Sequence, residues 1–340
     1  MGMHKIGHER SIIDIIRGRF SYTNKYWKGE IITGIGDFGA ALKRPDGSVV
    51  GLSMDGVGTK LMIAEILNRN ETIGVDLIAM NVNDLAAIGI TEELILLNYI
   101  AVPELCEDQV SAIVGGMERA CHAVEMIAIG GETACMPDIY RGGTYDLAAA
   151  VIGFAKSCDD VVVGKNTIEC GMRVFGCASS GAHSNGFRTI RSVFGISTED
   201  DYAETGSLVC LNRRREELCG GTLGDALLIP TAIYTNVVRE TNKKHRIAGM
   251  AHITGGGLVE NLPRILPHGC AMFIDTSTWK LPPIFSFIQD RGNLSDMAMR
   301  SVFNCGIGFV AVSDEDLSDC GFFEVGEIVE TDKEQHVIFA

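Results

Sequence analysis

Glycine clusters at the ends of apolar runs constrain the fold of this chain more than any other sequence feature. The 340 residues include 40 glycines, about 12% against a usual ~7%. Glycine permits positive φ angles and lets a backbone approach another group closely. The clusters lie at residues 34–39, 56–58, 115–116, 130–131, 142–143, 181–186, 220–224, 255–257 and 306–308. Several of them end a run typical of a strand, so we expect strands that lead into tight loops open to ligands.

Strands and helices are expected to alternate along the chain, in two blocks. The first block has candidate strands at 49–54, 94–101, 126–129 and 145–155, and candidate helices at 72–88 and 110–124. The second has candidate strands at 174–178, 247–253, 270–274, 308–312 and 336–339, and candidate helices at 187–194 and 258–266. A polar stretch at 156–171 separates the blocks. This pattern predicts an α/β (mixed α+β) chain with domains 1–165 and 166–340, each a mixed sheet covered by helices.

Charge, hydropathy and cysteine spacing exclude several classes of protein. A formal net charge of −15 argues against a nucleic-acid partner, which needs a broad basic face. The apolar runs are shorter than the roughly 18–20 residues of a membrane span, and no apolar leader opens the chain. The eleven cysteines include no C-x-x-C pair, so we expect mostly buried, reduced thiols in the cytoplasm and no zinc cluster.

The segment D-G-V-G-T-K at 55–60 combines the parts that phosphate chemistry needs. Backbone amides approach oxygens, a lysine supplies positive charge, and a carboxylate can hold Mg²⁺. The bland alternative is a tight turn with a solvated lysine. The candidate nucleotide-binding residues are Asp55, Gly56, Gly58, Thr59 and Lys60.

Three polar side chains share one stripe of the predicted helix 72–88. At 100° per residue, Asp76, Asn83 and Asp84 fall within about 100° of one another, while apolar residues fill most of the remaining surface. A helix of this kind is buried, so the stripe must be paired, hydrogen-bonded or bound to metal. With Asp55 it suits a site for Mg²⁺ and a nucleotide. The alternative is a polar stripe that faces solvent.

A glycine turn is expected at Gly130-Gly131-Glu132-Thr133, directly after a strand. By itself this segment is typical of a surface turn. Beside the other two segments, Glu132 becomes a further candidate for contact with Mg²⁺ or nucleotide.

Two loops in the second block are candidate anion sites. The loop S-S-G-A-H-S-N-G at 179–186 offers hydroxyls, amides and a helix N-terminus. The segment A-H-I-T-G-G-G at 251–257 places three glycines ahead of a helix and a histidine that suits proton transfer. His183 is alternatively a loop histidine bonded to the backbone, and His252 a satisfied core histidine.

Together these segments resemble one family. The motifs S-M-D-G-V-G-T-K-L (53–61), G-V-D-L-I-A-M-N-V-N-D-L (74–85), G-G-E-T-A-C-M-P (130–137), S-S-G-A-H-S-N-G (179–186), A-H-I-T-G-G-G-L-V-E-N-L-P-R-I-L-P (251–267) and F-N-C-G-I-G (303–308) keep the order and spacing of the aminoimidazole ribonucleotide synthetase family, also called phosphoribosylformylglycinamidine cyclo-ligases. The resemblance runs from about Gly34 to the C-terminus.

The resemblance implies a fold, a reaction and an assembly. The fold is a two-domain ATP-binding synthetase, and the N-terminal sheets pair in a homodimer. The reaction is a ligase step of purine biosynthesis in the cytoplasm. ATP drives the cyclisation of formylglycinamidine ribonucleotide to aminoimidazole ribonucleotide through an iminophosphate intermediate. Magnesium is implied as a cofactor, and K⁺ is a further candidate. The substrate is a phosphorylated small molecule.

Carried over residue by residue, the resemblance also implies site roles. ATP would bind Asp55, Gly56, Gly58, Thr59, Lys60, Asp76, Gly130, Gly131 and Glu132. The metal would bind Asp55, Asp76, Asn83, Asp84 and Glu132. The substrate would bind Ser180, Gly181, His183, Ser184, Asn185, Thr254, Gly255, Gly256 and Gly257. The catalytic candidates are His183, His252 and Lys60.

A second hypothesis belongs to a different class. The chain has Asn98, Cys135 and Ala232 where the family pattern has acidic, acidic and basic residues. A catalytically weak paralogue that binds nucleotide as a regulatory or structural dimer would tolerate these changes. Both hypotheses predict nucleotide binding that depends on Mg²⁺, and only the enzyme hypothesis predicts turnover.

Overall fold

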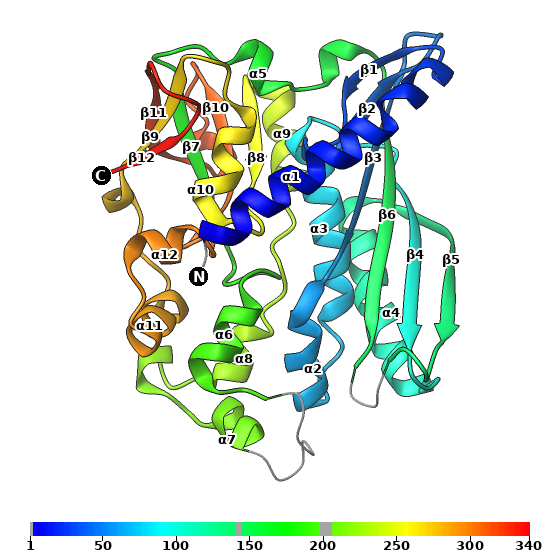
Figure 1. Cartoon of the computed structure of the whole chain (residues 1–340), viewed down its shortest axis with the longest axis vertical. Coiled ribbons are helices and arrows are strands. Elements are labelled where there is room, and N and C mark those ends of the chain that lie inside the picture. Colours follow the sequence, from blue (N-terminus) through cyan, green and yellow to red (C-terminus); the bar gives the residue numbers. More distant parts are fainter. Residues whose placement is uncertain (1–2, 141–143, 198–205) are drawn as a thin grey trace.

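Two six-stranded mixed sheets lie side by side, and a buried helix runs between them (Figure 1). The computed structural model describes residues 3–140, 144–197 and 206–340. All strands of the first sheet precede residue 156, and all strands of the second follow residue 172. The two sheets therefore correspond to the two blocks of the sequence.

Sheet A is antiparallel except where β4 and β5 run parallel. In spatial order its strands are β1 (Glu30–Thr33), β2 (Ala40–Lys43), β3 (Val49–Gly56), β6 (Asp146–Ala155), β4 (Ile95–Val102) and β5 (Ile127–Cys135). Alternate residues of β6 are buried, as expected for a strand that packs on one face.

Sheet B is antiparallel except where β12 and β9 run parallel. Its strands are, in spatial order, β12 (Val337–Phe339), β9 (Cys270–Ile274), β11 (Phe323–Glu330), β7 (Arg173–Ala178), β10 (Ile307–Ser313) and β8 (Gly249–His252). Every residue of β10 is buried, so both faces of this strand are covered.

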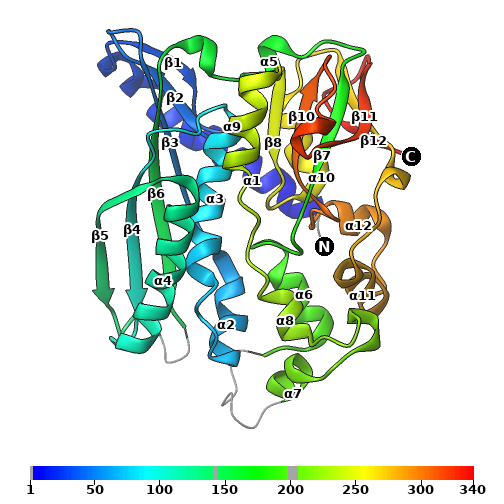
Figure 2. The same cartoon turned by 180° about the vertical axis from the view of Figure 1, so that it is seen from behind.

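Helices fill the space between the sheets and cover the C-terminal half (Figures 1 and 2). They are α1 (Met3–Phe20), α2 (Leu61–Leu67), α3 (Ile73–Ala87), α4 (Glu107–Val124), α5 (Gly164–Thr167), α6 (Phe187–Phe194), α7 (Gly206–Asn212), α8 (Leu223–Leu227), α9 (Thr235–Lys244), α10 (Gly257–Asn261), α11 (Pro283–Gly292) and α12 (Asp296–Arg300). No helix among the described residues has the length and apolarity needed to cross a bilayer.

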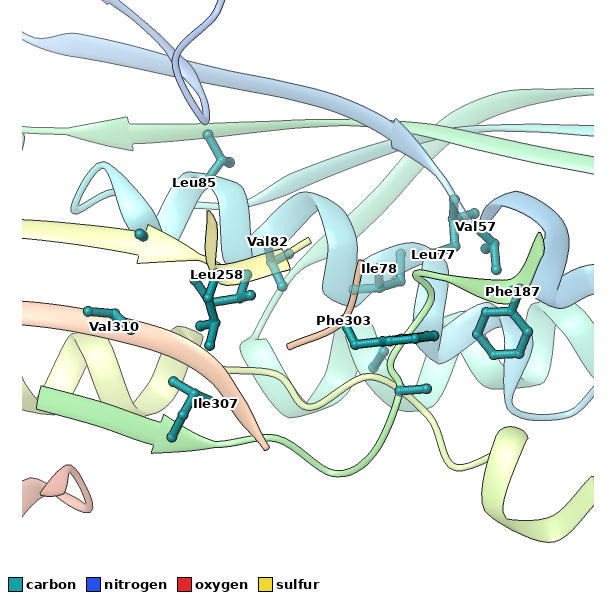
Figure 3. Close-up of a cluster of buried hydrophobic side chains, with 14 of the residues drawn as sticks. Val57, Leu77, Ile78, Val82, Leu85, Phe187, Leu258, Phe303, Ile307 and Val310 are labelled. Carbon is teal, nitrogen blue, oxygen red and sulfur yellow. The ribbon is translucent and has the colours of Figure 1, made fainter. Parts of the chain in front are cut away.

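Helix α3 is the centre of the molecule. All of its residues except Val75 and Asp84 are buried, and it packs on β3, β6, β8, α4 and α9. A Cβ on Gly74 would collide with the backbone of α4, so glycine is required where the two helices cross. Figure 3 shows Val82 of α3 beside Leu258 of α10, two members of one core that both halves share.

The sequence predicted most of the main elements correctly and was wrong in one place that bears on the site. Gly130–Thr133 is not a turn, because these residues continue β5 to Cys135. Helices cover sheet A, as expected, and within the described ranges they pack on one of its faces; Met54 on the other face is 77% exposed. The strand β11 was not predicted, because a register shift between Glu324 and Gly326 breaks its alternation.

The cysteines are free but not mostly buried, which corrects a second expectation. All eleven are unpaired thiols, four of them exposed and only three buried. The exposed thiols are Cys106, Cys135, Cys170 and Cys219.

Candidate nucleotide and substrate site between the two sheets

A buried ion pair joins the loop after β3 to helix α3. Lys60 Nζ lies 2.9 Å from each carboxylate oxygen of Asp76, and both side chains are fully buried. Lys60 Nζ also donates to the carbonyl oxygen of Ile229 at 2.7 Å. Burial lowers the pKa of Lys60, and the charge of Asp76 offsets part of that effect. The lysine is therefore held inside the protein by two partners.

The same carboxylate holds two segments of the C-terminal half. Asp76 Oδ1 accepts hydrogen bonds from the backbone N–H and the hydroxyl of Thr231, each at 2.7 Å. It also accepts from the hydroxyl of Ser184 at 3.1 Å. Asp76 thus serves as an anchor between the halves, and its predicted roles as a ligand of metal and nucleotide remain predictions.

Asn83 lies seven residues after Asp76, about two turns further along α3, and makes a second anchor between the halves. Its Oδ1 accepts from the backbone N–H of Tyr234 at 2.8 Å, which fixes the orientation of the amide. Its Nδ2 donates to the carbonyl oxygen of Ala232 at 2.8 Å and lies 3.4 Å from His252 Nε2. Because the amide is buried and its oxygen is occupied, the predicted role of Asn83 as a metal ligand is not supported by this geometry.

Asp84, the third member of the predicted stripe, meets His252 at the end of β8. His252 Nδ1 and Asp84 Oδ1 are 2.9 Å apart. Since Asn83 presents a donor to Nε2, that nitrogen is the acceptor, and Nδ1 then carries a proton that faces Asp84. The histidine is fully buried, whereas Asp84 keeps 16% of its side-chain surface exposed. Asp84 therefore retains an oxygen for a ligand.

Asp55 is the second carboxylate of this cluster. Asn81, which the sequence analysis did not single out, holds the backbone of Asp55 from α3 by accepting from its N–H at 3.0 Å and donating to its carbonyl at 3.3 Å. Burial, followed by the neighbouring charge of Asp84, raises the pKa of Asp55 to about 6. Two carboxylates that destabilise each other's charge are a setting that a divalent cation would relieve.

His183 holds the 179–186 loop against residues 229–234, the segment that follows α8, by accepting hydrogen bonds from both. Its Nε2 accepts from the backbone N–H of Ser180 at 3.2 Å and of Ala232 at 3.5 Å. Burial, then the charges of His252 and Lys60, holds the pKa of His183 well below its ordinary value. The ring is therefore neutral, with its proton on Nδ1, a buried atom without a hydrogen-bond partner among the described residues.

The two anion loops lie against each other. Asn185 Oδ1 would lie 3.6 Å from a Cβ on Gly255, and no other heavy atom comes within 4 Å of that Cβ. The Nδ2 of Asn185 is buried and has no partner within the described part of the chain. A Cβ on Gly257, in contrast, would collide with the backbone at Arg300 and Phe303. Gly255 thus borders open space, while Gly257 is required by internal packing.

Sheet register decides which strand residues reach the cluster. Asp55, Ala149, Asn98 and Gly131 form one row across β3, β6, β4 and β5, so their side-chain directions share the face that packs on α3. Glu132 belongs to the next row, opposite Tyr99. It points to the other face of the sheet, so the structure does not bring Glu132 together with Asp55 and Asp84.

The other predicted residues lie around this cluster. Ser180 Oγ donates to the carbonyl of Pro230 at 2.6 Å, and Thr254 Oγ1 donates to Asn261 at 3.4 Å. A Cβ on Gly58 would lie 4.0 Å from the Ser184 carbonyl. The backbone N–H of Gly56 donates to the carboxylate of Asp55. The carbonyl oxygen of Thr59 accepts from Arg191, and that of Gly181 accepts from Asn304. Gly130 on β5 lies opposite Leu97 on β4.

Sequence reasoning missed the segment 229–234, which supplies partners to Lys60, Asp76, Asn83 and His183. Most of these contacts come from its backbone. No side-chain pattern could have indicated them, because backbone groups are the same at every position.

The arrangement defines a class of protein in which two mixed sheets enclose one buried helix and loops from both halves meet. Its fold is that of AaThiL, solved in a complex with AMPPCP and TMP, at a TM-score of 0.65 and 17% identity over 97% of this chain and 93% of that one. A thiamine monophosphate kinase from Aquifex aeolicus has a TM-score of 0.62 and 16% sequence identity, over 96% of this chain and 94% of that one. At these identities the likeness is one of fold.

The family is then defined by sequence. Residues 36–155 match the N-terminal domain of the AIR synthase related proteins, and residues 169–338 match their C-terminal domain. A phosphoribosylformylglycinamidine cyclo-ligase of Nitrosospira multiformis is 40% identical, over 86% of this chain and 79% of the relative. A phosphoribosylformylglycinamidine cyclo-ligase of Crocosphaera subtropica is 39% identical, over 96% of this chain and 95% of the relative. The chain belongs to the AIR synthase related family.

Proposed function

We propose that this protein is a phosphoribosylformylglycinamidine cyclo-ligase, which closes the imidazole ring of aminoimidazole ribonucleotide at the expense of ATP. The observation that carries the proposal is the match along 79–95% of the length of relatives so named, at 38–40% identity. Three other family motifs contact the motif on α3, through Lys60, Ser184 and His252. This supports the proposal, because such a cyclisation needs a nucleotide and a phosphorylated substrate held in one place.

The metal and the nucleotide phosphates are proposed to bind at Asp55 and Asp84. The raised pKa of Asp55 fits a pair of carboxylates built to share a cation. Mg²⁺ prefers oxygen ligands and would neutralise charge on the phosphoryl group being transferred. Asn98, in the register row of Asp55, offers a further neutral oxygen on the same sheet face. Gly56, Gly58 and Thr59 remain the proposed backbone contacts of the phosphates.

The substrate is proposed to bind where the loops 179–186 and 254–257 meet. The unpartnered, buried Nδ2 of Asn185 and the buried, unpartnered hydroxyl of Ser179 are donors without protein acceptors among the described residues. Unpaired buried donors are costly unless a ligand satisfies them. The open space beside Gly255 gives a ligand oxygen access to the amide of Asn185.

The two histidines are proposed as positioning residues. His252 donates to Asp84 and so orients a proposed metal ligand, as carboxylate partners of histidine commonly do. His183 fixes the substrate loop against residues 230–232. Lys60 is proposed to hold Asp76 in place, because both of its contacts lie within the protein.

The proposed division of labour follows the two halves of the chain. Residues 1–165 would bind ATP and form a homodimer, and residues 166–340 would bind the substrate phosphate. The outer face of sheet A supports the dimer. Eight of the nine residues of β5 are exposed, and on this face Ile127 is 57% and Met54 77% exposed, an apolar patch of the kind that marks an interface. The free thiols favour a cytoplasmic location.

The test is turnover by the purified protein. We expect formation of aminoimidazole ribonucleotide, with matched release of ADP and phosphate, when formylglycinamidine ribonucleotide, ATP, Mg²⁺ and K⁺ are all present. The variant Asp84→Asn should lose most of this activity, and His122→Ala, exposed on α4, is the matched control. Nucleotide binding without any product in the wild-type protein would overturn the proposal.

A further inference from the structure

Three side chains with different metal-binding atoms meet at the end of α9, away from the proposed nucleotide site. The ligand atoms of His245, Asp319 and Cys320 all lie within 4.8 Å of one another. His245 ends α9, and Asp319 and Cys320 belong to the 3₁₀ turn η7 (Ser318–Cys320). We propose that this cluster is a binding site for a single Zn²⁺ ion, which ties α9 to η7.

The histidine is held in the orientation that a metal ligand requires. One ring nitrogen, Nδ1, lies 2.8 Å from the Glu315 carboxylate, and the other, Nε2, lies 2.8 Å from Asp319. Zinc-bound histidines regularly pass their second N–H to a carboxylate, which fixes the ring and strengthens the bond to the metal. Glu315 supplies that support, so Nε2 is the nitrogen that would bind the ion in place of a proton.

The mixture of atoms selects the metal. Imidazole nitrogen, thiolate sulfur and carboxylate oxygen together form a typical zinc donor set, whereas Mg²⁺ and Ca²⁺ take oxygen ligands almost exclusively. Ligand atoms at about 2.0–2.3 Å from a tetrahedral zinc are roughly 3.3–3.7 Å from each other. The three ligand atoms, now within 4.8 Å of one another, would reach that spacing with shifts of about an ångström, and water can complete the site.

A lysine competes with the ion for the same carboxylate. Lys244 Nζ lies 3.4 Å from Asp319 Oδ2, and half of the lysine side chain is exposed. The ammonium group can therefore move into solvent when the ion binds. Removing its charge should strengthen zinc binding, which a hydrogen-bonded cluster with no metal would not predict.

The site was not foreseen from sequence because its ligands are about 75 residues apart and contain no C-x-x-C pair. Helix α9 follows directly on the segment 229–234 that holds α3 and the 179–186 loop. A metal at the C-terminal end of α9 would hold this helix in place, and with it the adjoining segment 229–234.

The test uses the full chain, stripped of metal with a chelator. Titration with Zn²⁺ should give one site, and Co²⁺ should give the near-ultraviolet thiolate-to-metal band and the intense visible bands of a tetrahedral site. We expect His245→Ala and Cys320→Ser each to weaken Zn²⁺ binding at least ~10-fold, Glu315→Gln to weaken it ~10-fold, and Lys244→Gln to strengthen it. His122→Ala and Cys219→Ser are exposed controls that should change nothing.

Three results would overturn the proposal: no stoichiometric Zn²⁺ binding, equal binding by Cys320→Ser, or a Co²⁺ complex without the thiolate band. The first would mean that the cluster is only a charged hydrogen-bond network. Circular dichroism of each variant separates loss of the site from loss of the fold. Turnover of the proposed reaction is a separate measurement, so either proposal can fail while the other stands.

Discussion

The buried pair of Lys60 and Asp76 allows the sharpest prediction, because the family resemblance implies a role for the lysine at the nucleotide, whereas its hydrogen bonds in the structure go to Asp76 and Ile229. Lys60→Met keeps the length of the side chain and removes its charge. Asp76 would then retain three donors, two from Thr231 and one from Ser184. Asp76→Asn would leave the buried ammonium without a counter-charge, with only neutral carbonyl oxygens such as that of Ile229 as partners.

The magnitudes follow from those partners. Breaking a buried ion pair by removing one member costs about 3–5 kcal/mol, because the other charge stays buried without compensation. We expect Lys60→Met at the low end, ~3 kcal/mol, and Asp76→Asn at the high end, ~5 kcal/mol. The double variant retains neither charge, so its loss of stability should fall short of the sum of the two single losses by about 2–3 kcal/mol.

The assay is urea unfolding of the three variants, followed by circular dichroism and fitted with one m-value. Additivity of the two single losses to within ~0.5 kcal/mol would refute the coupling. Binding of a non-hydrolysable ATP analogue, measured under conditions where Lys60→Met is folded, separates the two roles. Affinity within about threefold of wild type is expected. Loss of that affinity without loss of stability would return Lys60 to the nucleotide.

Three further predictions follow from the same geometry. Between about pH 4 and pH 6 the folded state binds a proton at Asp55 that the unfolded chain releases, so without metal stability should fall by up to ~3 kcal/mol as pH rises through that window. Asp55→Asn should abolish this fall, and an unchanged pH profile in urea unfolding would contradict it. Asn83→Ala should lower stability by about 2–3 kcal/mol by leaving the buried Tyr234 N–H unpaired, and a thermal melt at wild-type temperature would count against the anchor. Gly257→Ala should lower stability by about 2–5 kcal/mol through a positive φ of 57° and a backbone clash, whereas Gly255→Ala should leave stability near wild type and raise the KM for the substrate. The reverse pattern in calorimetry and kinetics would refute the distinction between the two glycines.

Local pattern was sufficient for much of the fold. Apolar runs that end in glycine clusters identified most strands, and the nearly all-apolar surface of 72–88 predicted a buried helix whose polar stripe had to be satisfied. That requirement is general, because a buried polar group without a partner is unstable wherever it lies. The prediction that Asp76, Asn83 and Asp84 are paired, hydrogen-bonded or metal-bound needed no knowledge of the partners.

Which of those outcomes applies to each residue was decided by the tertiary structure alone. Asp76 and Asn83 each accept a backbone N–H from a residue about 150 positions away, and a backbone amide leaves no mark in the sequence. Register likewise decided that Asn98 shares a sheet face with Asp55 and that Glu132 does not, since a shift of one residue reverses the face. The sequence therefore determined which residues carry chemistry, and packing determined which of them remain free to use it.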